Sequence, residues 1–132
     1  ARAVAWTRRH AAEIGADPGR LHLLGHSSGA HLGALLALDP RRLAQVGGTR
    51  AWLAGFAGIA GPYWFATDAN PHMARFFGPR ERHPEAQPVR FAARGAPRCL
   101  LVHGGADRMV RPRNSRELAR RLAAAGVPVT LR

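Results

Sequence analysis

Residues 21–32 read LHLLGHSSGAHL, an aliphatic run followed by glycines, serines and histidines, and this stretch decides the fold. The run at 21–25 is typical of a short buried strand. Residues 27–39 are rich in alanine and leucine on nearly every side, which predicts a central, covered helix stopped by Pro40. A tight turn between a buried strand and a buried helix therefore falls on the two serines.

Helical and strand-like segments alternate along the rest of the chain. Residues 61–97 follow no single period and predict a long excursion, with short helices near 72–77 and 85–93. Because apolar strands separated by helices favour a parallel sheet covered on both faces, we expect an α/β fold with a mostly parallel sheet in one domain, residues 1–132. The other predicted elements are helices over 1–15 and 114–125, and strands over 52–59, 98–104 and 127–131.

The helix predicted at 114–125 carries its own start and stop signals. Asn114 is the expected N-cap, and Glu117 follows three residues later as in a capping box. Glu117 and Arg121 are spaced for an i,i+4 ion pair, and the leucines form the inner stripe. Gly126 is the expected end of the helix.

The turn at the serines fits the pattern G-x-S-x-G, and only when the pattern is centred on Ser27. Between a strand and a helix, this pattern places a nucleophile on a tight, strained turn. Gly25 and Gly29 would let the strand and the helix pass without a Cβ collision. The N–H of Ser28, at the helix N-terminus, can help to hold an oxyanion. A glycine-rich turn without chemistry is the alternative.

A nucleophilic serine needs a base, and the base needs an orienting acid. Asp107 is the best acid, because it follows the third predicted strand at the same edge of the sheet as Ser27. Asp17 precedes a strand, Asp39 lies at the far end of the helix, and Asp68 in the excursion is the remaining competitor. The alternative role for Asp107 is that of a turn residue bonding its own backbone.

No histidine has the position expected of the base. The chain order should be Ser, Asp, then His, and none of the seven histidines follows Asp107. His103 ends the third strand and is expected to hold the following loop by hydrogen bonding. Structural or solvent roles are expected for the other six, which are His10, His22, His26, His31, His72 and His83.

Taken together, these stretches resemble the α/β-hydrolase superfamily. Within it, they are similar to the small carboxylesterases and lipase-like enzymes related to the hormone-sensitive lipase and acetyl-xylan or feruloyl esterase groups. The resemblance covers most of the chain in family order. It is carried by DPGRLHLLGHSSGAHLGALLAL (17–38), GIAGPYWF (58–65), FFGP (76–79) and CLLVHGGADRMVRPRNSRELARRLAAAGVPV (99–129).

The resemblance implies catalytic roles at three positions. Ser27 would be the nucleophile, Asp107 the acid, and the Ser28 N–H one half of the oxyanion hole. The family's catalytic histidine and its upstream His-Gly-Gly-type loop are not found in the sequence. These departures suggest a partial α/β-hydrolase fold, truncated at both ends, and the 132 residues alone are expected to be a poor or inactive catalyst.

The resemblance also assigns the excursion at 61–97 to the family's cap region. Tyr63, Trp64 and Phe76 would then line a pocket for the acyl or alcohol part of a substrate. Ordinary core packing is the alternative for each of these aromatic residues.

The composition bears on partners and cofactors. The formal net charge of +12 comes from arginine alone, but the arginines are scattered, so we expect no nucleic acid and keep an arginine-driven nucleic-acid binder as a rival. No apolar run of membrane-spanning length is present, so no membrane partner is expected. Cys99 is the only cysteine and is typical of a strand core. A cytoplasmic location is the default expectation.

The resulting hypothesis is a serine hydrolase that cleaves carboxylic esters through an acyl-enzyme on Ser27, with a small-molecule ester as substrate. No metal and no organic cofactor are expected. Two alternatives share the same residues: an amide-directed relative, such as a formamidase or a serine peptidase, and a non-catalytic fragment.

Overall fold

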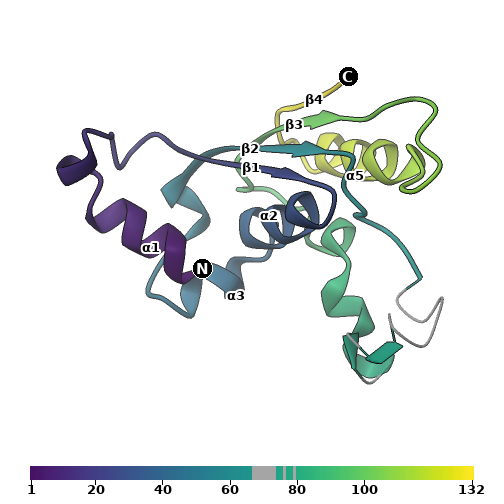
Figure 1. Cartoon of the computed structure of the whole chain (residues 1–132), viewed down its shortest axis with the longest axis horizontal. Coiled ribbons are helices and arrows are strands. Elements are labelled where there is room, and N and C mark those ends of the chain that lie inside the picture. The colour runs from purple at the N-terminus through teal and green to yellow at the C-terminus, as the bar shows by residue number, and fades with distance from the viewer. Residues whose placement is uncertain (67–73, 76, 79) are drawn as a thin grey trace.

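The computed structural model describes residues 1–66, 74–75, 77–78 and 80–132. Its centre is a sheet of four parallel strands in the order β1-β2-β3-β4, so neighbours in the sheet are also consecutive in the chain (Figure 1). The predicted parallel α/β sheet is therefore confirmed. The strands are β1 (Leu21–His26), β2 (Leu53–Ile59), β3 (Arg98–Val102) and β4 (Val129–Leu131).

The helices lie on one side of this sheet. In Figure 1, α2 and α5 both pack beneath the strands, and α1 lies beyond the end of β1. The α-helices are α1 (Arg2–Arg9), α2 (Ser28–Leu38), α3 (Pro40–Ala44) and α5 (Arg113–Ala124). Short 3-10 helices are η1 (Ala12–Ile14), η2 (Arg50–Trp52), η3 (Arg80–Ala86) and η4 (Pro88–Phe91).

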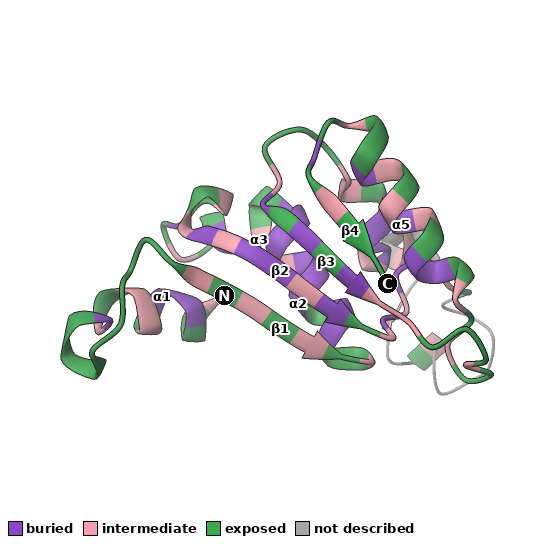
Figure 2. Ribbon diagram, turned by 90° about the horizontal axis from the view of Figure 1, so that it is seen from above, coloured by how far each residue is buried: buried purple, intermediate pink, exposed green. Residues whose placement is uncertain are grey.

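The expectation of helices on both faces is wrong for the described part of the chain. Figure 2 looks onto the opposite face, where no helix crosses in front of the strands. Leu24 is 75% exposed there and Leu100 is 41% exposed. The strands looked like continuous apolar runs, but exposure alternates along β1, and His22 and His26 fall on its exposed positions. Alternation of this kind marks a strand with one covered face.

The covered face of the sheet forms the core with the inner sides of the two long helices. Leu38 of α2, Leu101 of β3, and Leu118 and Leu122 of α5 are all completely buried. Phe56 of β2 packs in the same cluster. Each buried side chain of this size contributes about 1.5–3 kcal/mol, so the contacts of α2 and α5 with the sheet fix both helices in place.

The carboxyl ends of the first three strands are level with one another. His26, Ile59 and Val102 are register partners across β1, β2 and β3. The ladder continues one step further, because Ser27 N donates to Ile59 O and Ala60 N donates to Val102 O, both at 2.9 Å. The residues that follow these strands therefore meet at one edge of the sheet.

The start of α5 differs from the expectation. The helix begins at Arg113 after Pro112, and Asn114 does not cap it. Instead, Asn114 Oδ1 accepts a hydrogen bond from Trp64 N at 2.7 Å, which ties the start of the excursion to α5. Glu117 does not complete a capping box either, since its carboxylate accepts from Arg120 and Arg121. The expected ion pair and helix end are confirmed: Arg121 Nε donates to Glu117 Oε1 at 2.6 Å, and Gly126 ends the helix with φ +72°.

Two other predicted helices are divided. The stretch at 1–15 forms α1 and then η1, and it ends at Gly15 with φ +70°. The helix expected over 85–93 is replaced by η3 and η4, because Pro84 and Pro88 interrupt regular α-helical hydrogen bonding. The short helix expected near 72–77 falls largely outside the described residues.

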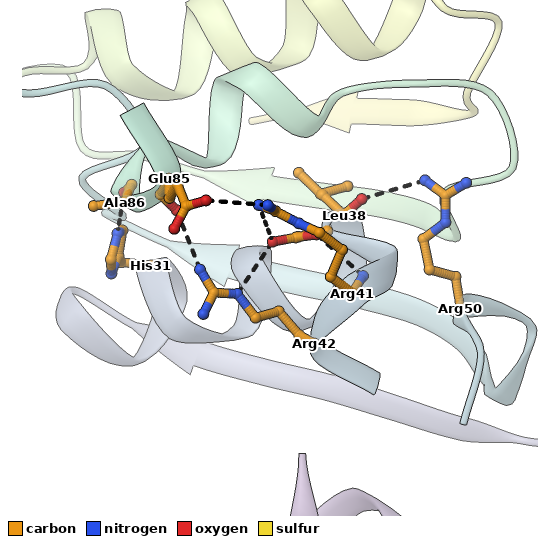
Figure 3. Close-up of polar contacts among 8 residues, drawn as sticks. His31, Leu38, Arg41, Arg42, Arg50, Glu85 and Ala86 are labelled. Carbon is orange, nitrogen blue, oxygen red and sulfur yellow. Dashed lines mark hydrogen bonds and ion pairs between the residues drawn. The ribbon is translucent and has the colours of Figure 1, made fainter. Parts of the chain in front are cut away.

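An ionic cluster anchors the second half of the excursion to α2 and α3 (Figure 3). The buried Asp39 carboxylate accepts from Arg41 Nε at 2.9 Å and Arg42 Nε at 3.1 Å. Arg41 also reaches Glu85 Oε1 at 3.1 Å, and His31 Nε2 donates to Ala86 O at 2.7 Å.

These bonds settle the charge of Asp39. Burial acts to raise the pKa of its carboxyl, but the hydrogen bonds and positive charge of Arg41 outweigh burial and lower that pKa. The carboxylate is therefore ionised, and η3 is held against the helix that begins after Ser27.

Candidate active site

Ser27 occupies a strained turn between β1 and α2. Its backbone has φ 52° and ψ −120°, in a region that L-residues rarely adopt and that costs about 1–3 kcal/mol. The surroundings hold it there: Ser27 N donates to Ile59 O at 2.9 Å, and Ser27 O accepts from His31 N at 3.1 Å. The side chain makes no capping bond to α2, so its hydroxyl is available for other partners.

The two glycines beside this turn are not equivalent. A Cβ added at Gly25 would lie 2.3 Å from Gly29 O and 2.6 Å from Ala30 N, so no side chain fits there. A Cβ added at Gly29 would meet no atom of the described chain within 4 Å. The expected steric need for glycine is therefore present at Gly25, and the same expectation for Gly29 is wrong.

Ser28 is the first residue of α2. The N–H groups in the first turn of a helix have no intrahelical acceptor, and they lie at the positive end of the helix dipole. The Ser28 N–H is thus suited to stabilising negative charge that develops beside the Ser27 hydroxyl.

Asp107 lies on the loop after β3, at the same edge of the sheet. Its Oδ1 accepts from Met109 N at 2.9 Å and from Val110 N at 3.0 Å. The hydrogen bond from Val110 is the main cause that lowers the pKa of this carboxyl, helped by Met109 and His103 and opposed by burial. Asp107 therefore does bond its own turn, through Oδ1. These bonds hold the carboxyl group in place, and its lowered pKa keeps it ionised.

His103 holds the Asp107 loop, as predicted. Its side chain is only 2% exposed. Nε2 donates to Val110 O at 2.8 Å, and Nδ1 lies 2.7 Å from Ser115 Oγ. Both ring nitrogens are thus occupied, which removes His103 as a base for Ser27.

The other described histidines do not supply the base either. His10 Nδ1 donates to Trp6 O at 2.9 Å on α1, and His83 Nε2 donates to Gly78 O at 2.8 Å. His31 Nε2 donates to Ala86 O, and burial lowers the pKa of its imidazole. His22 and His26 are on the uncovered side of β1, and His72 and the competing acid Asp68 lie outside the described residues.

The aromatic residues assigned to a substrate pocket do not form one. Tyr63 is completely buried in the core, against positions where Gly58 and Gly61 leave room for its ring, so the pocket role is wrong for Tyr63. Trp64 is 50% exposed and borders a hollow of about 380 Å³ with residues of η4 and α5. Neither Ser27 nor Asp107 lines that hollow. Phe76 lies outside the described residues.

A second hollow, of about 670 Å³, lies on the uncovered face of the sheet and is lined by residues of all four strands, again without Ser27 or Asp107. Within the described ranges, no group of three or more His, Cys, Asp or Glu side chains is arranged to hold a metal ion. No described helix has the length and apolarity needed to cross a membrane.

Two residues near this edge of the sheet were not predicted from the sequence. Ala60, directly after β2, has φ 50°, and it is the one other non-glycine residue besides Ser27 with positive φ in the described part of the chain. Nothing in the sequence signals it. Ser115, the partner of His103, does have a signal, because a polar residue three positions before Leu118 falls on the buried stripe of α5.

Two curated proteins match most of this chain. Esterase LipC of Mycobacterium tuberculosis (strain ATCC 25618 / H37Rv) is 32% identical over 139 residues, covering 92% of this chain and 34% of that protein. Esterase LipQ of the same organism is 31% identical over 140 residues, covering 95% of this chain and 33% of that protein. The chain thus spans about one third of the length of these curated relatives.

Solved structures share the fold. A truncated form of a carbohydrate esterase from gut microbiota superposes with a TM-score of 0.82 at 23% identity, over 98% of this chain and 55% of that one. The apo form of Thermogutta terrifontis esterase 2 gives 0.79 at 23% identity, over 98% of this chain and 49% of that one. The family defined by the alpha/beta hydrolase fold matches residues 1–132, and the chain belongs to this family.

Proposed function

We propose that the protein containing this chain is a carboxylic ester hydrolase that works through an acyl-enzyme on Ser27. The observation that carries the proposal is the strained backbone of Ser27 between β1 and α2, at the sheet edge that also bears the Asp107 carboxylate. Two relatives that match 92% and 95% of the chain are named esterases, which supports an ester substrate.

The spacing of the two groups suits a triad. Parallel strands lie about 4.8 Å apart, so residues that follow β1 and β3 are separated by roughly 10 Å. One imidazole with a hydrogen bond at each nitrogen spans roughly 7–8 Å between the two oxygens, so the side chains of Ser27 and Asp107 need to bridge only a few ångströms of that backbone separation. A histidine between Ser27 and Asp107 would therefore contact both, with Asp107 fixing its tautomer.

The base itself is assigned to a histidine outside these 132 residues. In this arrangement the histidine follows the acid in chain order, and no histidine follows Asp107. The described histidines are bonded elsewhere or lie on the uncovered face of β1. The relatives are about three times as long as this chain, which leaves room for the base elsewhere in the polypeptide.

The reaction then has two halves. Ser27 Oγ attacks the ester carbonyl as the histidine takes its proton, and the Ser28 N–H donates to the oxyanion. The C–O bond to the alcohol breaks, and the alcohol leaves with the proton from the imidazolium. In the second half, water attacks the acyl-enzyme, the histidine takes a proton from the water, and the carboxylic acid leaves as Ser27 Oγ is reprotonated.

The test is hydrolysis of p-nitrophenyl acetate and labelling by a fluorophosphonate, both with the intact protein. Ser27→Ala is expected to lower kcat by roughly 10⁴-fold or more and to abolish labelling. Ser28→Ala is the matched control, because it removes a neighbouring hydroxyl and keeps the backbone N–H, so activity and labelling should persist. Full activity in Ser27→Ala would refute the proposal. Faster turnover of an amide panel than of the esters would favour the amide-directed alternative.

A further inference from the structure

We propose that His103 is a positioning residue for the acid of the triad. It fixes the Asp107 carboxylate so that Oδ2, and not Oδ1, is the oxygen that accepts the hydrogen bond of the catalytic imidazole. This assignment rests on the proposed function and specifies how the acid of that same site is held.

The two oxygens of Asp107 have different surroundings. Oδ1 accepts two backbone hydrogen bonds, from Met109 N at 2.9 Å and Val110 N at 3.0 Å. A carboxylate oxygen has two lone pairs, so two hydrogen bonds use its capacity to accept. Oδ2 lies 3.5 Å from His103 Nε2, which is too long for a good hydrogen bond. The side chain is 22% exposed, so Oδ2 keeps the capacity and the access to accept a further donor.

The imidazole of His103 is itself locked on both sides. Its Nε2 donates to Val110 O at 2.8 Å, and Val110 is the residue whose N–H donates to Asp107 Oδ1. On the other side, Nδ1 lies 2.7 Å from the hydroxyl of Ser115, which is completely buried on α5. Nε2 thus carries a proton toward the Val110 carbonyl, and Nδ1 is held by its hydrogen bond with the Ser115 hydroxyl.

The ring therefore connects three elements: the end of β3, the Asp107 loop and the N-terminal turn of α5. The loop between them begins with Gly104 and Gly105, both exposed and without side chains that could fix it. Without the bond to Val110 O, the turn that holds Oδ1 would lose its hydrogen bond to the end of β3. A displacement of about 1 Å in a catalytic group is enough to cost about 10²-fold in rate.

The experiment compares His103→Leu, His103→Gln and Ser115→Ala in the intact protein, with p-nitrophenyl acetate as substrate. His103→Leu removes both ring bonds and is expected to lower kcat by roughly 10²-fold with KM changed less than about threefold. His103→Gln retains an N–H donor near the position of Nε2 and should recover most of the lost kcat. Ser115→Ala removes the bond to Nδ1 alone and should lower kcat by several-fold.

The pH profile of kcat/KM separates positioning from mere loss of stability. A loosely held Asp107 stabilises the catalytic imidazolium less, so the acid limb should move to lower pH in His103→Leu and in Ser115→Ala. Leu122→Val is the control, because it removes one methylene group from the core contact of α5, away from the Asp107 loop. It should lower the melting temperature and leave kcat and the acid limb unchanged.

The outcomes are distinguishable. If Ser27→Ala is inactive but His103→Leu and Ser115→Ala keep wild-type kcat and an unmoved acid limb, His103 has no positioning role and only this inference fails. If His103→Leu does not fold, Ser115→Ala alone decides, and an unmoved acid limb overturns the inference. If Ser27→Ala retains activity, the proposed function fails first.

Discussion

Replacing Gly25 by alanine tests the structural basis of the serine turn most directly. The new Cβ would lie 2.3 Å from Gly29 O, 2.4 Å from Gly29 C and 2.6 Å from Ala30 N. All three are backbone atoms, so no side chain can rotate away. Since Cβ atoms essentially never approach closer than 3.0 Å, the end of β1 and the start of α2 must separate by at least about 0.7 Å.

That separation acts on Ser27, which lies between the two elements. Overpacking of this kind costs about 1–3 kcal/mol of unfolding free energy, and more where the neighbours are rigid. Moving the nucleophile by a similar distance is expected to lower the rate of labelling by a fluorophosphonate by about 10²-fold. Gly25→Ala should therefore lose both stability and reactivity.

Gly29→Ala provides the matched control, four residues away. The added Cβ meets no described atom within 4 Å, and alanine in a helix is favoured over glycine by about 0.5–1 kcal/mol. In urea unfolding of the intact protein, Gly25→Ala should thus have a lower unfolding free energy than the wild type, and Gly29→Ala a higher one. Equal unfolding free energies and equal labelling rates for the two variants would refute the reasoning.

Three further predictions concern buried or charged groups. Tyr63 Oη has no hydrogen-bond partner among the described residues, so Tyr63→Phe should leave the unfolding free energy unchanged or raise it by up to about 1 kcal/mol in urea titrations. A clear loss of unfolding free energy in Tyr63→Phe would show that Tyr63 Oη has a hydrogen-bond partner. Burial raises the pKa of Cys99 to about 12, so a disulfide reagent at pH 8 should modify it only as fast as the protein opens. Arg120 and Arg121 lower the pKa of Glu117 from 4.5 to about 2. The stabilisation is complete above pH 4.5 and is lost as pH falls toward 2. In Glu117→Gln, the urea concentration at the unfolding midpoint should therefore depend less on pH between pH 4.5 and pH 2. An unchanged pH dependence would contradict the last prediction.

Local signals in the sequence predicted the parts of the fold that depend on neighbouring residues. The strand-to-helix turn at Ser27 follows from an aliphatic run, two glycines and an apolar helix, all within one short stretch. Gly126 ends α5 for an equally local reason, since it adopts a positive φ that other residues avoid. The parallel direction of the strands follows from their separation by long, mostly helical segments, because parallel neighbours need a crossover connection.

The errors have long-range causes. Asn114 has the chemistry of an N-cap, but its side chain bonds Trp64 N, fifty positions earlier in the chain. Tyr63 was predicted to line a pocket, but it is buried because Gly58 and Gly61 leave space for its ring. That space exists only in the folded chain. The hydrogen bond between His103 and Ser115 likewise connects the end of β3 to α5. It can form only after α5 has packed against the sheet.

The backbone of Ser27 has a consequence for laboratory evolution. A glycine at position 27 would adopt φ 52° without the penalty that serine bears there, about 1–3 kcal/mol. Variants chosen for heat resistance alone should therefore drift toward glycine at this position and lose the hydroxyl. A selection for stability must therefore measure turnover in parallel, because this stabilising substitution removes the reactive group.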